Sequence, residues 1–207
     1  IEYQAWLGQV RSRIRLEDVE VRENVAASAL MMVEEVGFDG IHFDVEPIWD
    51  EDMEFIDVLR LTREALPEAN ISVAMAEFIP KLLIRLTDDK KEWQNYNSEV
   101  NYENVAKYAD QIAVMVYDTR VKTDWLYRLL MREQVIWLSD LLEGKELFVG
   151  VPAYEDETRD SDPNVENLEN ALRGMTDGLN NWRSDRDNFA GVAIYAFWEI
   201  SDDEWEV

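Results

Sequence analysis

Three ionisable side chains occupy alternate positions in the segment FDGIHFDVEP, residues 38–47. In an extended strand, residues two apart point to the same face, so His42, Asp44 and Glu46 share one face and the apolar residues between them share the other. Two carboxylates at this spacing lie about 6–7 Å apart at Cα and drive their pKa values apart. One carboxyl group can then remain protonated as a proton donor while the other stays ionised. The segment therefore predicts acid–base chemistry, against the simpler interpretation of a solvated strand end.

The same three side chains allow a second interpretation, as ligands of a metal ion. Imidazole and carboxylate groups together suit Zn²⁺, Mn²⁺ or Fe²⁺. However, alternate residues on one straight strand rarely converge on a single ion, and His42 is the only histidine of the chain. We therefore predict no metal and no other cofactor, and keep a metal-dependent hydrolase as the weaker alternative.

Strand-like runs alternate with amphipathic helical stretches along the chain. This alternation predicts parallel strands joined by right-handed crossovers, and hence an α/β fold. No glycine-rich phosphate loop follows any strand, which counts against an open nucleotide-binding sheet. The expected strands are 3–8, 40–46, 71–78, 112–117, 147–154 and 192–198, the expected helices are 21–36, 51–65, 125–142 and 165–182, and residues 87–104 are expected to form a polar insertion.

Polar and aromatic residues gather at the carboxyl ends of these strands. Catalytic groups occupy this edge in a (β/α)8 barrel, so we expect a barrel. A complete barrel has about 250 residues, and this chain has 207. We therefore expect a single barrel domain over residues 1–207 that contains strands three to eight and lacks the first one or two βα units. The strand-end residues are Glu46, Glu77, Tyr117, Asp118, Tyr154, Glu155, Trp198 and Glu199.

The composition excludes several classes of partner. The net charge is −25, which counts against binding to nucleic acid or to anionic membranes. No apolar run reaches the 18 residues of a membrane span. The chain has no cysteine, so it forms no disulfide. It begins with Ile1 close to a strand, so we expect it to be part of a longer polypeptide.

Four motifs together resemble the family 18 glycoside hydrolases, the chitinase and endo-β-N-acetylglucosaminidase group. The fourth barrel strand of that family carries Asp-Gly-x-Asp-x-Asp-x-Glu, and residues 39–46 read DGIHFDVE. Its sixth strand carries Met-x-Tyr-Asp, matched at 115–118, and its seventh often reads Gly-x-Pro-x-Tyr, matched at 150–154. Its eighth strand ends in a tryptophan, matched by Trp198. The motifs occur in order and at barrel-like spacing, and they cover essentially the whole chain.

The resemblance implies a substrate-assisted hydrolysis of β-linked N-acetylglucosamine glycans such as chitin or peptidoglycan. Glu46 would be the general acid, and Asp44 would hold the substrate's 2-acetamido group, whose carbonyl oxygen attacks the anomeric carbon. Tyr117 would bind that carbonyl, Asp118 would contact the distorted sugar, and Trp198 would form an apolar floor. Such an enzyme would act outside the cell or at its surface.

Further candidates for substrate binding come from the same motifs and from the strand ends. They are Asp39, His42, Met115, Tyr154, Trp6 and Glu77.

The chain departs from the family pattern at His42, where the family usually has an aspartate that shares protons with the Asp44 position. A charged histidine would favour two ionised carboxylates and would lower the pKa of the acid. A carbohydrate-binding barrel without activity is therefore a second hypothesis. The presence of both Asp44 and Glu46 argues against it.

Overall fold

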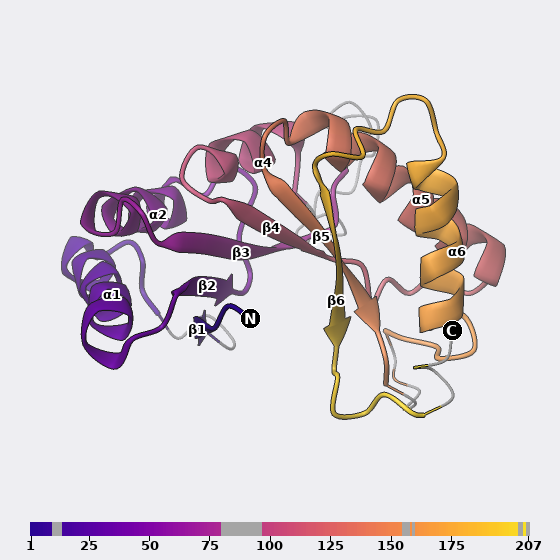
Figure 1. Ribbon diagram of the computed structural model, residues 1–207, viewed down its shortest axis with the longest axis horizontal. Helices are drawn as coiled ribbons and strands as arrows, with labels where there is room; N and C mark the ends of the chain where they lie inside the picture. Colours follow the sequence, from indigo (N-terminus) through magenta and orange to yellow (C-terminus); the bar gives the residue numbers. More distant parts are fainter. Residues whose placement is uncertain (10–13, 80–96, 155–157, 159, 203–204, 206–207) are drawn as a thin grey trace. The chain divides into compact units, whose positions relative to one another are not determined.

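The structure is a computed structural model that describes residues 1–9, 14–79, 97–154, 158, 160–202 and 205 (Figure 1). These residues form two compact units, Ile1–Ile112 and Ala113–Val207, and each unit is described by itself. The described part of the chain holds six β-strands, and helices alternate with them.

The first unit contains three strands in the order of the sequence, and adjacent strands are parallel. They are β1 (Gln4–Gln9), β2 (Gly40–Val45) and β3 (Asn70–Ala76). Its helices are α1 (Val19–Met31), which continues into a π-helical turn, η1 (Met32–Val36), then α2 (Met53–Ala65) and α4 (Glu99–Ala106).

The core of this unit lies on the apolar face of β2. Ile41 and Phe43 are fully buried, and the Phe43 ring meets Phe55 of α2 edge-on at a centroid distance of 6.2 Å. Because side chains alternate along a strand, this packing directs His42 and Asp44 to the opposite face of β2.

Helices α1 and α2 of the first unit begin at aspartate caps. Asp18 accepts a hydrogen bond from the backbone N–H of Glu20, and Asp52 accepts one from Phe55 N at 2.9 Å. Such caps satisfy amide groups that the first helical turn leaves unpaired. Gly37 ends η1 with a left-handed backbone, φ 91°, which glycine adopts without steric cost. The chain then enters β2.

The second unit contains the strands β4, β5 and β6 in this order. β4 (Gln111–Met115) starts within the first unit and is followed by β5 (Glu146–Pro152), which pairs in parallel with β6 (Phe189–Tyr195). Two helices, α5 (Asp124–Leu141) and α6 (Leu168–Leu179), lie side by side in this unit (Figure 1).

Two glycines of α6 allow α5 and α6 to approach closely. A Cβ atom on Gly174 would lie 2.5 Å from the carbonyl oxygen of Arg128, and one on Gly178 would lie 2.8 Å from the Cβ of Val135. Both neighbours belong to α5, so the absence of a side chain at 174 and 178 sets the contact between the two helices.

The expected alternation of strands and helices is confirmed, with element ends shifted by up to three residues. Two differences matter for the site. Helix α4 lies in the predicted polar insertion, where the buried pair Tyr102 and Val105 gives it an apolar side. Residues 87–96 of that prediction lie outside the described residues. Strand β6 ends at Tyr195, three positions before the predicted end at Trp198. Within the described ranges, no helix has the length and apolarity needed to cross a membrane.

The α5–α6 contact predicts that Gly174→Ala destabilises the protein although alanine is the better helix former. The new methyl group would overlap the backbone of α5, and we expect the free energy of unfolding to fall by about 1–3 kcal/mol. Urea unfolding followed by circular dichroism measures this change.

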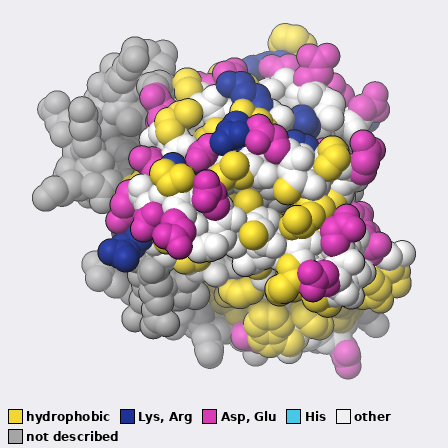
Figure 2. All heavy atoms as spheres, turned by 90° about the vertical axis from the view of Figure 1, so that its left-hand side faces the viewer, with side chains coloured by type: hydrophobic (Ala, Val, Ile, Leu, Met, Phe, Trp, Pro, Cys, Tyr) yellow, Lys and Arg dark blue, Asp and Glu magenta, His cyan; other side chains and the backbone are white. Residues whose placement is uncertain are grey.

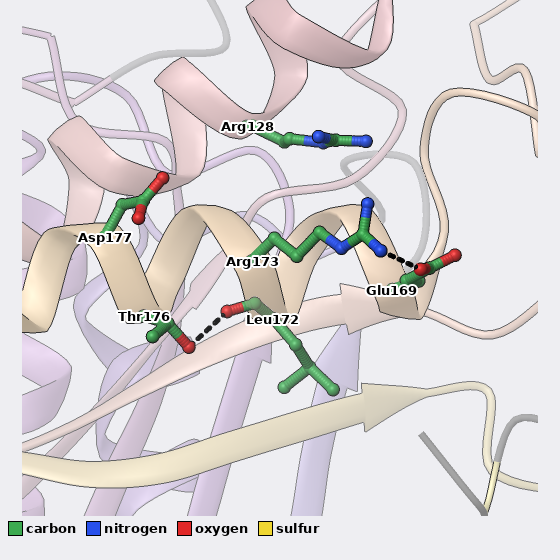
Figure 3. A pocket seen from close by; sticks show the side chains of 6 residues that line it. All are labelled: Arg128, Glu169, Leu172, Arg173, Thr176 and Asp177. Carbon is green, nitrogen blue, oxygen red and sulfur yellow. Dashed lines mark hydrogen bonds and ion pairs between the residues drawn. The ribbon is translucent and has the colours of Figure 1, made fainter.

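The matched control for this experiment is Thr176→Ala on the exposed side of α6. Among the described residues, its hydroxyl group bonds to the Leu172 carbonyl of the preceding turn (Figure 3). We expect this variant to be at least as stable as the parent protein. An equal loss of stability in both variants would contradict the assignment of Gly174 to the helix contact.

Candidate functional site

The two oxygens of Asp44 have different surroundings. Oδ2 accepts a hydrogen bond from the indole Nε1–H of Trp6 at 3.0 Å. Oδ1 is buried and has no hydrogen-bond partner among the residues that the structure describes. Trp6 reaches Asp44 across Gly8, where an added Cβ would lie 2.1 Å from the indole ring. Because Gly8 pairs with Asp44 in the register of β1 and β2, the missing side chain leaves the indole its place beside the carboxylate.

Glu46 is exposed and follows Val45, the last residue of β2. Its backbone carbonyl accepts a hydrogen bond from Nε2 of Gln9, the last residue of β1, at 3.3 Å. This contact ties the end of β2 to the end of β1. The predicted acid therefore lies at the carboxyl edge of the sheet, two residues beyond Asp44.

His42 lies between β1 and β3 and is bound through one ring nitrogen. Its Nδ1 atom is 2.6 Å from Oγ of Ser72, and Ser72 Oγ donates to Oε1 of Gln4 at 2.5 Å. Burial lowers the pKa of His42, and the nearby charge of Asp44 opposes this shift only in part. The neutral imidazole is therefore favoured. The lowered pKa counts against the predicted case of a charged histidine beside two ionised carboxylates.

The other predicted residues of the first unit have separate environments. Asp39 is at the amino end of β2, where its carboxylate accepts from Tyr3 N at 2.8 Å, so the structure does not bring it together with Asp44 and Glu46. Glu77 is buried rather than solvated. Burial of Tyr102 raises the pKa of its hydroxyl, and the charge of Glu77 raises that pKa further. Trp6 has 58% of its surface exposed while its N–H is bound to Asp44.

Four aromatic rings form a cluster at the strand ends of the second unit. Tyr117 and Tyr195 stack with a centroid distance of 5.0 Å and an interplanar angle of 11°. Tyr154 and Trp198 each meet Tyr195 edge-on at 6.4 Å. Trp198 is 68% exposed and Tyr195 is 49% exposed, so the cluster offers apolar ring surface to a ligand.

Two motif residues beside this cluster shape it. A Cβ atom on Gly150 would lie 3.1 Å from Cε1 of Tyr117, so the glycine makes room for the tyrosine ring. Met115 is the last residue of β4 and lies beside Gly150 of β5. The Cα atom of Met115 would be 3.3 Å from a Cβ atom added to Gly150. The absence of a side chain at Gly150 thus leaves room both for the Tyr117 ring and for the backbone of β4.

Asp118 has a left-handed backbone, φ 56°, and its Oδ1 accepts a hydrogen bond from the Tyr154 hydroxyl at 2.8 Å. Burial and then this carboxylate raise the pKa of Tyr154, so its hydroxyl stays protonated and acts as a donor. Asp118 and Tyr154, which were predicted separately as substrate-binding residues, are therefore joined by a hydrogen bond within the second unit.

Two residues of the second unit were not predicted. Tyr195 ends β6 and is the central ring of the aromatic cluster, and the run of aromatic residues at 195, 197 and 198 is the signal that could have indicated it. Glu166 is fully buried and accepts from the Thr119 hydroxyl at 2.7 Å and from Thr119 N at 3.2 Å. It thereby fixes the residue that follows Asp118. No sequence pattern points to Glu166.

Two hollows of the surface lie on helices, away from the strand ends. One measures about 520 Å³ and is lined by α5 and α6, with the ion pair of Arg173 and Glu169 at its edge (Figure 3). The other measures about 450 Å³ and includes Arg22, Asp57 and Arg60. Ion-paired side chains of the helices line both hollows. No predicted site residue is among the residues that line them.

The metal-dependent alternative finds no geometric support. Within the ranges that the structure describes, no three His, Asp or Glu side chains are placed to hold one ion. His42 also directs Nδ1 to Ser72.

Comparison with protein families decides the classification. The model of a family described as glycosyl hydrolases family 18 matches residues 13–203. The chain belongs to glycosyl hydrolase family 18. A search of the curated proteins found no match.

Solved structures confirm the barrel fold of this family 18 chain. It resembles a class V chitinase from Pseudomonas fluorescens with a TM-score of 0.64 and 12% identity, over 92% of this chain and 72% of that one. The spore cortex-lytic enzyme of Bacillus megaterium matches with a TM-score of 0.53 and 16% identity, over 74% of this chain and 36% of that one. A cell-surface-expressed chitinase from a Paenibacillus species matches with a TM-score of 0.50 and 14% identity, over 95% of this chain and 24% of that one. The chain thus spans well under two thirds of the latter two proteins.

The predicted resemblance and the α/β barrel class are confirmed by these matches. Membership in a glycoside hydrolase family also supports a carbohydrate as the substrate of the chain.

The environment of His42 predicts a low pKa in the folded family 18 chain. We expect the NMR titration of its imidazole to give a value below the ordinary 6.5. The unfolded chain then binds more protons than the folded one below pH 6.5, so this group's contribution to the free energy of unfolding falls as the pH falls.

The chain has a single histidine, so its ring signals are unambiguous. The same titration in concentrated urea gives the unfolded reference. A folded value equal to or above the unfolded one would refute the buried environment.

The hydrogen bonds of Glu166 to Thr119 predict that Glu166 stabilises the fold of this family 18 chain. Glu166→Ala leaves the N–H and hydroxyl of Thr119 without their acceptor, and we expect the free energy of unfolding to fall by about 1–3 kcal/mol. Chemical denaturation measures it. Glu169→Ala is the control, because Glu169 is exposed and its ion pair with Arg173 contributes at most about 0.5 kcal/mol. Comparable effects of the two substitutions would argue against the role of Glu166.

Proposed function

We propose that the chain hydrolyses β-linked N-acetylglucosamine glycans, such as chitin or peptidoglycan, by a substrate-assisted mechanism with retention of configuration. The observation that carries this proposal is the end of β2 in a family 18 chain, where Asp44 lies on the polar face and Glu46 follows the last strand residue directly. One oxygen of Asp44 is bound by Trp6, and the other has no partner in the described residues.

In the first step Glu46 donates its proton to the glycosidic oxygen, and the bond between that oxygen and the anomeric carbon breaks. The carbonyl oxygen of the substrate's own acetamido group forms the new bond to this carbon, which gives a cyclic oxazolinium ion. The released sugar leaves as an alcohol with the proton of Glu46. Asp44 accepts a hydrogen bond from the acetamido N–H and stabilises the positive charge of the oxazolinium ion.

In the second step the ionised Glu46 takes a proton from water, and the water oxygen bonds to the anomeric carbon. The ring of the oxazolinium ion opens and the acetamido group is restored. Two displacements at one carbon retain its configuration. Glu46 ends the cycle protonated.

The second unit supplies groups whose chemistry suits a sugar ligand. We propose that the Tyr117 hydroxyl binds the acetamido carbonyl and that Asp118 binds a sugar hydroxyl. Trp198 and Tyr195 would receive the apolar C–H face of a ring, for which their exposed surfaces are suited. The family match extends over both units, which supports one catalytic domain over residues 1–207.

The surface charge fits an uncharged polysaccharide better than a polyanion. Figure 2 shows acidic side chains spread over one face of the molecule, with fewer Lys and Arg among them. We propose an extracellular or cell-surface site of action. The similar Paenibacillus chitinase is described as expressed at the cell surface, and that likeness supports the location.

The second candidate function is binding of the same glycans without hydrolysis. The observation in its favour is that His42 stands at the position where the family usually has aspartate. Its test is the same experiment that tests hydrolysis.

Glu46→Gln is expected to reduce the release of a fluorogenic aglycone from N,N′-diacetylchitobioside and the chitotrioside by about 10²–10⁴-fold, because glutamine cannot donate the proton. The rate is measured between pH 4 and pH 8. Glu54→Gln is the control, since Glu54 is an exposed acid of the first turn of α2 and should leave turnover unchanged.

Turnover close to that of the parent protein in Glu46→Gln would refute the mechanism. Saturable sugar binding by a parent protein that shows no turnover would establish the binding function instead.

A further inference from the structure

Four polar side chains link the three strands of the first unit and β4 in one hydrogen-bonded chain. Gln4 Nε2 donates to Oε1 of Gln111 at 2.8 Å, so the amide oxygen of Gln4 faces the opposite way. That oxygen accepts the hydroxyl proton of Ser72 at 2.5 Å. Ser72 Oγ in turn lies 2.6 Å from Nδ1 of His42.

The direction of this chain fixes the proton on His42. A serine hydroxyl has one proton, and Ser72 gives it to Gln4 because an amide oxygen can only accept. Ser72 Oγ must therefore accept from His42, so the ring carries its proton on Nδ1. A neutral ring in this tautomer has no N–H at Nε2.

The tautomer matters because Asp44 lies two residues along the same strand face. Asp44 already accepts one hydrogen bond from Trp6, and its buried Oδ1 has no partner in the described part of the chain. A histidine with its proton on Nε2 would be a competing donor for such an acceptor. With the proton held on Nδ1, that competition is absent.

We infer that Ser72 and Gln4 are positioning residues that hold the single N–H of neutral His42 away from Asp44, which keeps Asp44 Oδ1 open for the N–H of a substrate acetamido group. The second half of this inference rests on the proposed function. The first half, the fixed tautomer, is independent of it.

The charges around His42 are few. Strands β1 (Gln4–Gln9) and β3 (Asn70–Ala76), which flank it, contain no charged residue. Its own strand face carries Asp44 and then Glu46. The tautomer is thus set by the neutral contacts of Ser72 and Gln4.

The tautomer is measured by long-range ¹H–¹⁵N NMR of protein labelled with ¹⁵N-histidine, which yields one set of ring signals because the chain has one histidine. We expect a protonated Nδ1 and an unprotonated Nε2 at pH 7. In Gln4→Leu the hydroxyl of Ser72 loses its acceptor and turns to Nδ1, so the proton is expected to move to Nε2. Ser72→Ala is expected to shift the population the same way, and Ser72→Thr, which retains a hydroxyl, to restore Nδ1–H.

The consequence for the substrate is measured as the dissociation constant of chitotriose in the Glu46→Gln background, where no turnover interferes. We expect Gln4→Leu and Ser72→Ala to weaken binding by about tenfold, the loss of one hydrogen bond to a charged group. Ser139→Ala is the control, because Ser139 is equally buried and its hydroxyl has no partner in the described residues. This variant should bind as the background does.

The outcomes separate the two proposals. A parent spectrum with the proton on Nε2, or an unchanged spectrum in Gln4→Leu, overturns the inference whatever the activity. The expected spectra with unchanged sugar affinity overturn its second half. The expected spectra without any sugar binding or Glu46-dependent turnover overturn the proposed function and leave the tautomer assignment standing.

Discussion

The burial of Ile41 and Phe43 fixes the direction of every other side chain in β2. Both residues are fully buried, and Phe43 packs against a ring of α2. A shift of one residue in the pairing of β2 would turn these side chains toward the polar face and bury His42 and Asp44 among helices. The cost of that exchange far exceeds any preference of the polar residues themselves. The arrangement of the candidate site is therefore a consequence of core packing.

On the polar face, the neighbouring strands assign a partner to almost every group. Trp6 of β1 binds Asp44, and Ser72 of β3 binds His42. The second unit shows the same principle, since Glu166 holds Thr119 and Tyr154 holds Asp118. Each of these contacts joins residues 30 or more apart in sequence. The buried Oδ1 of Asp44 has no such partner among the residues that the structure describes, and the proposed chemistry uses this atom.

The sequence was sufficient for features that depend on periodicity and insufficient for those that depend on a single distant contact. Alternation of polar and apolar residues predicted β2 and the shared face of His42 and Asp44, and motif order predicted the family. Helix α4 escaped because its buried side consists of few residues within a polar stretch. The end of β6 was misplaced because the aromatic run beyond Tyr195 has no polar residue to mark the boundary. Glu166 could not be found, since nothing in its neighbourhood distinguishes a buried acid from a solvated one.

The two glycines that lie beneath aromatic rings have a consequence for the entropy of binding. Trp6 extends over Gly8, and the ring of Tyr117 lies beside Gly150. Each ring occupies space that any side chain at the glycine would fill. Each ring also has a second contact, the hydrogen bond of Trp6 to Asp44 and the stacking of Tyr117 on Tyr195. A sugar that docked on such a ring would meet a side chain that these contacts already restrain. The side chain then loses little rotational freedom on binding, and more of the contact energy remains for affinity.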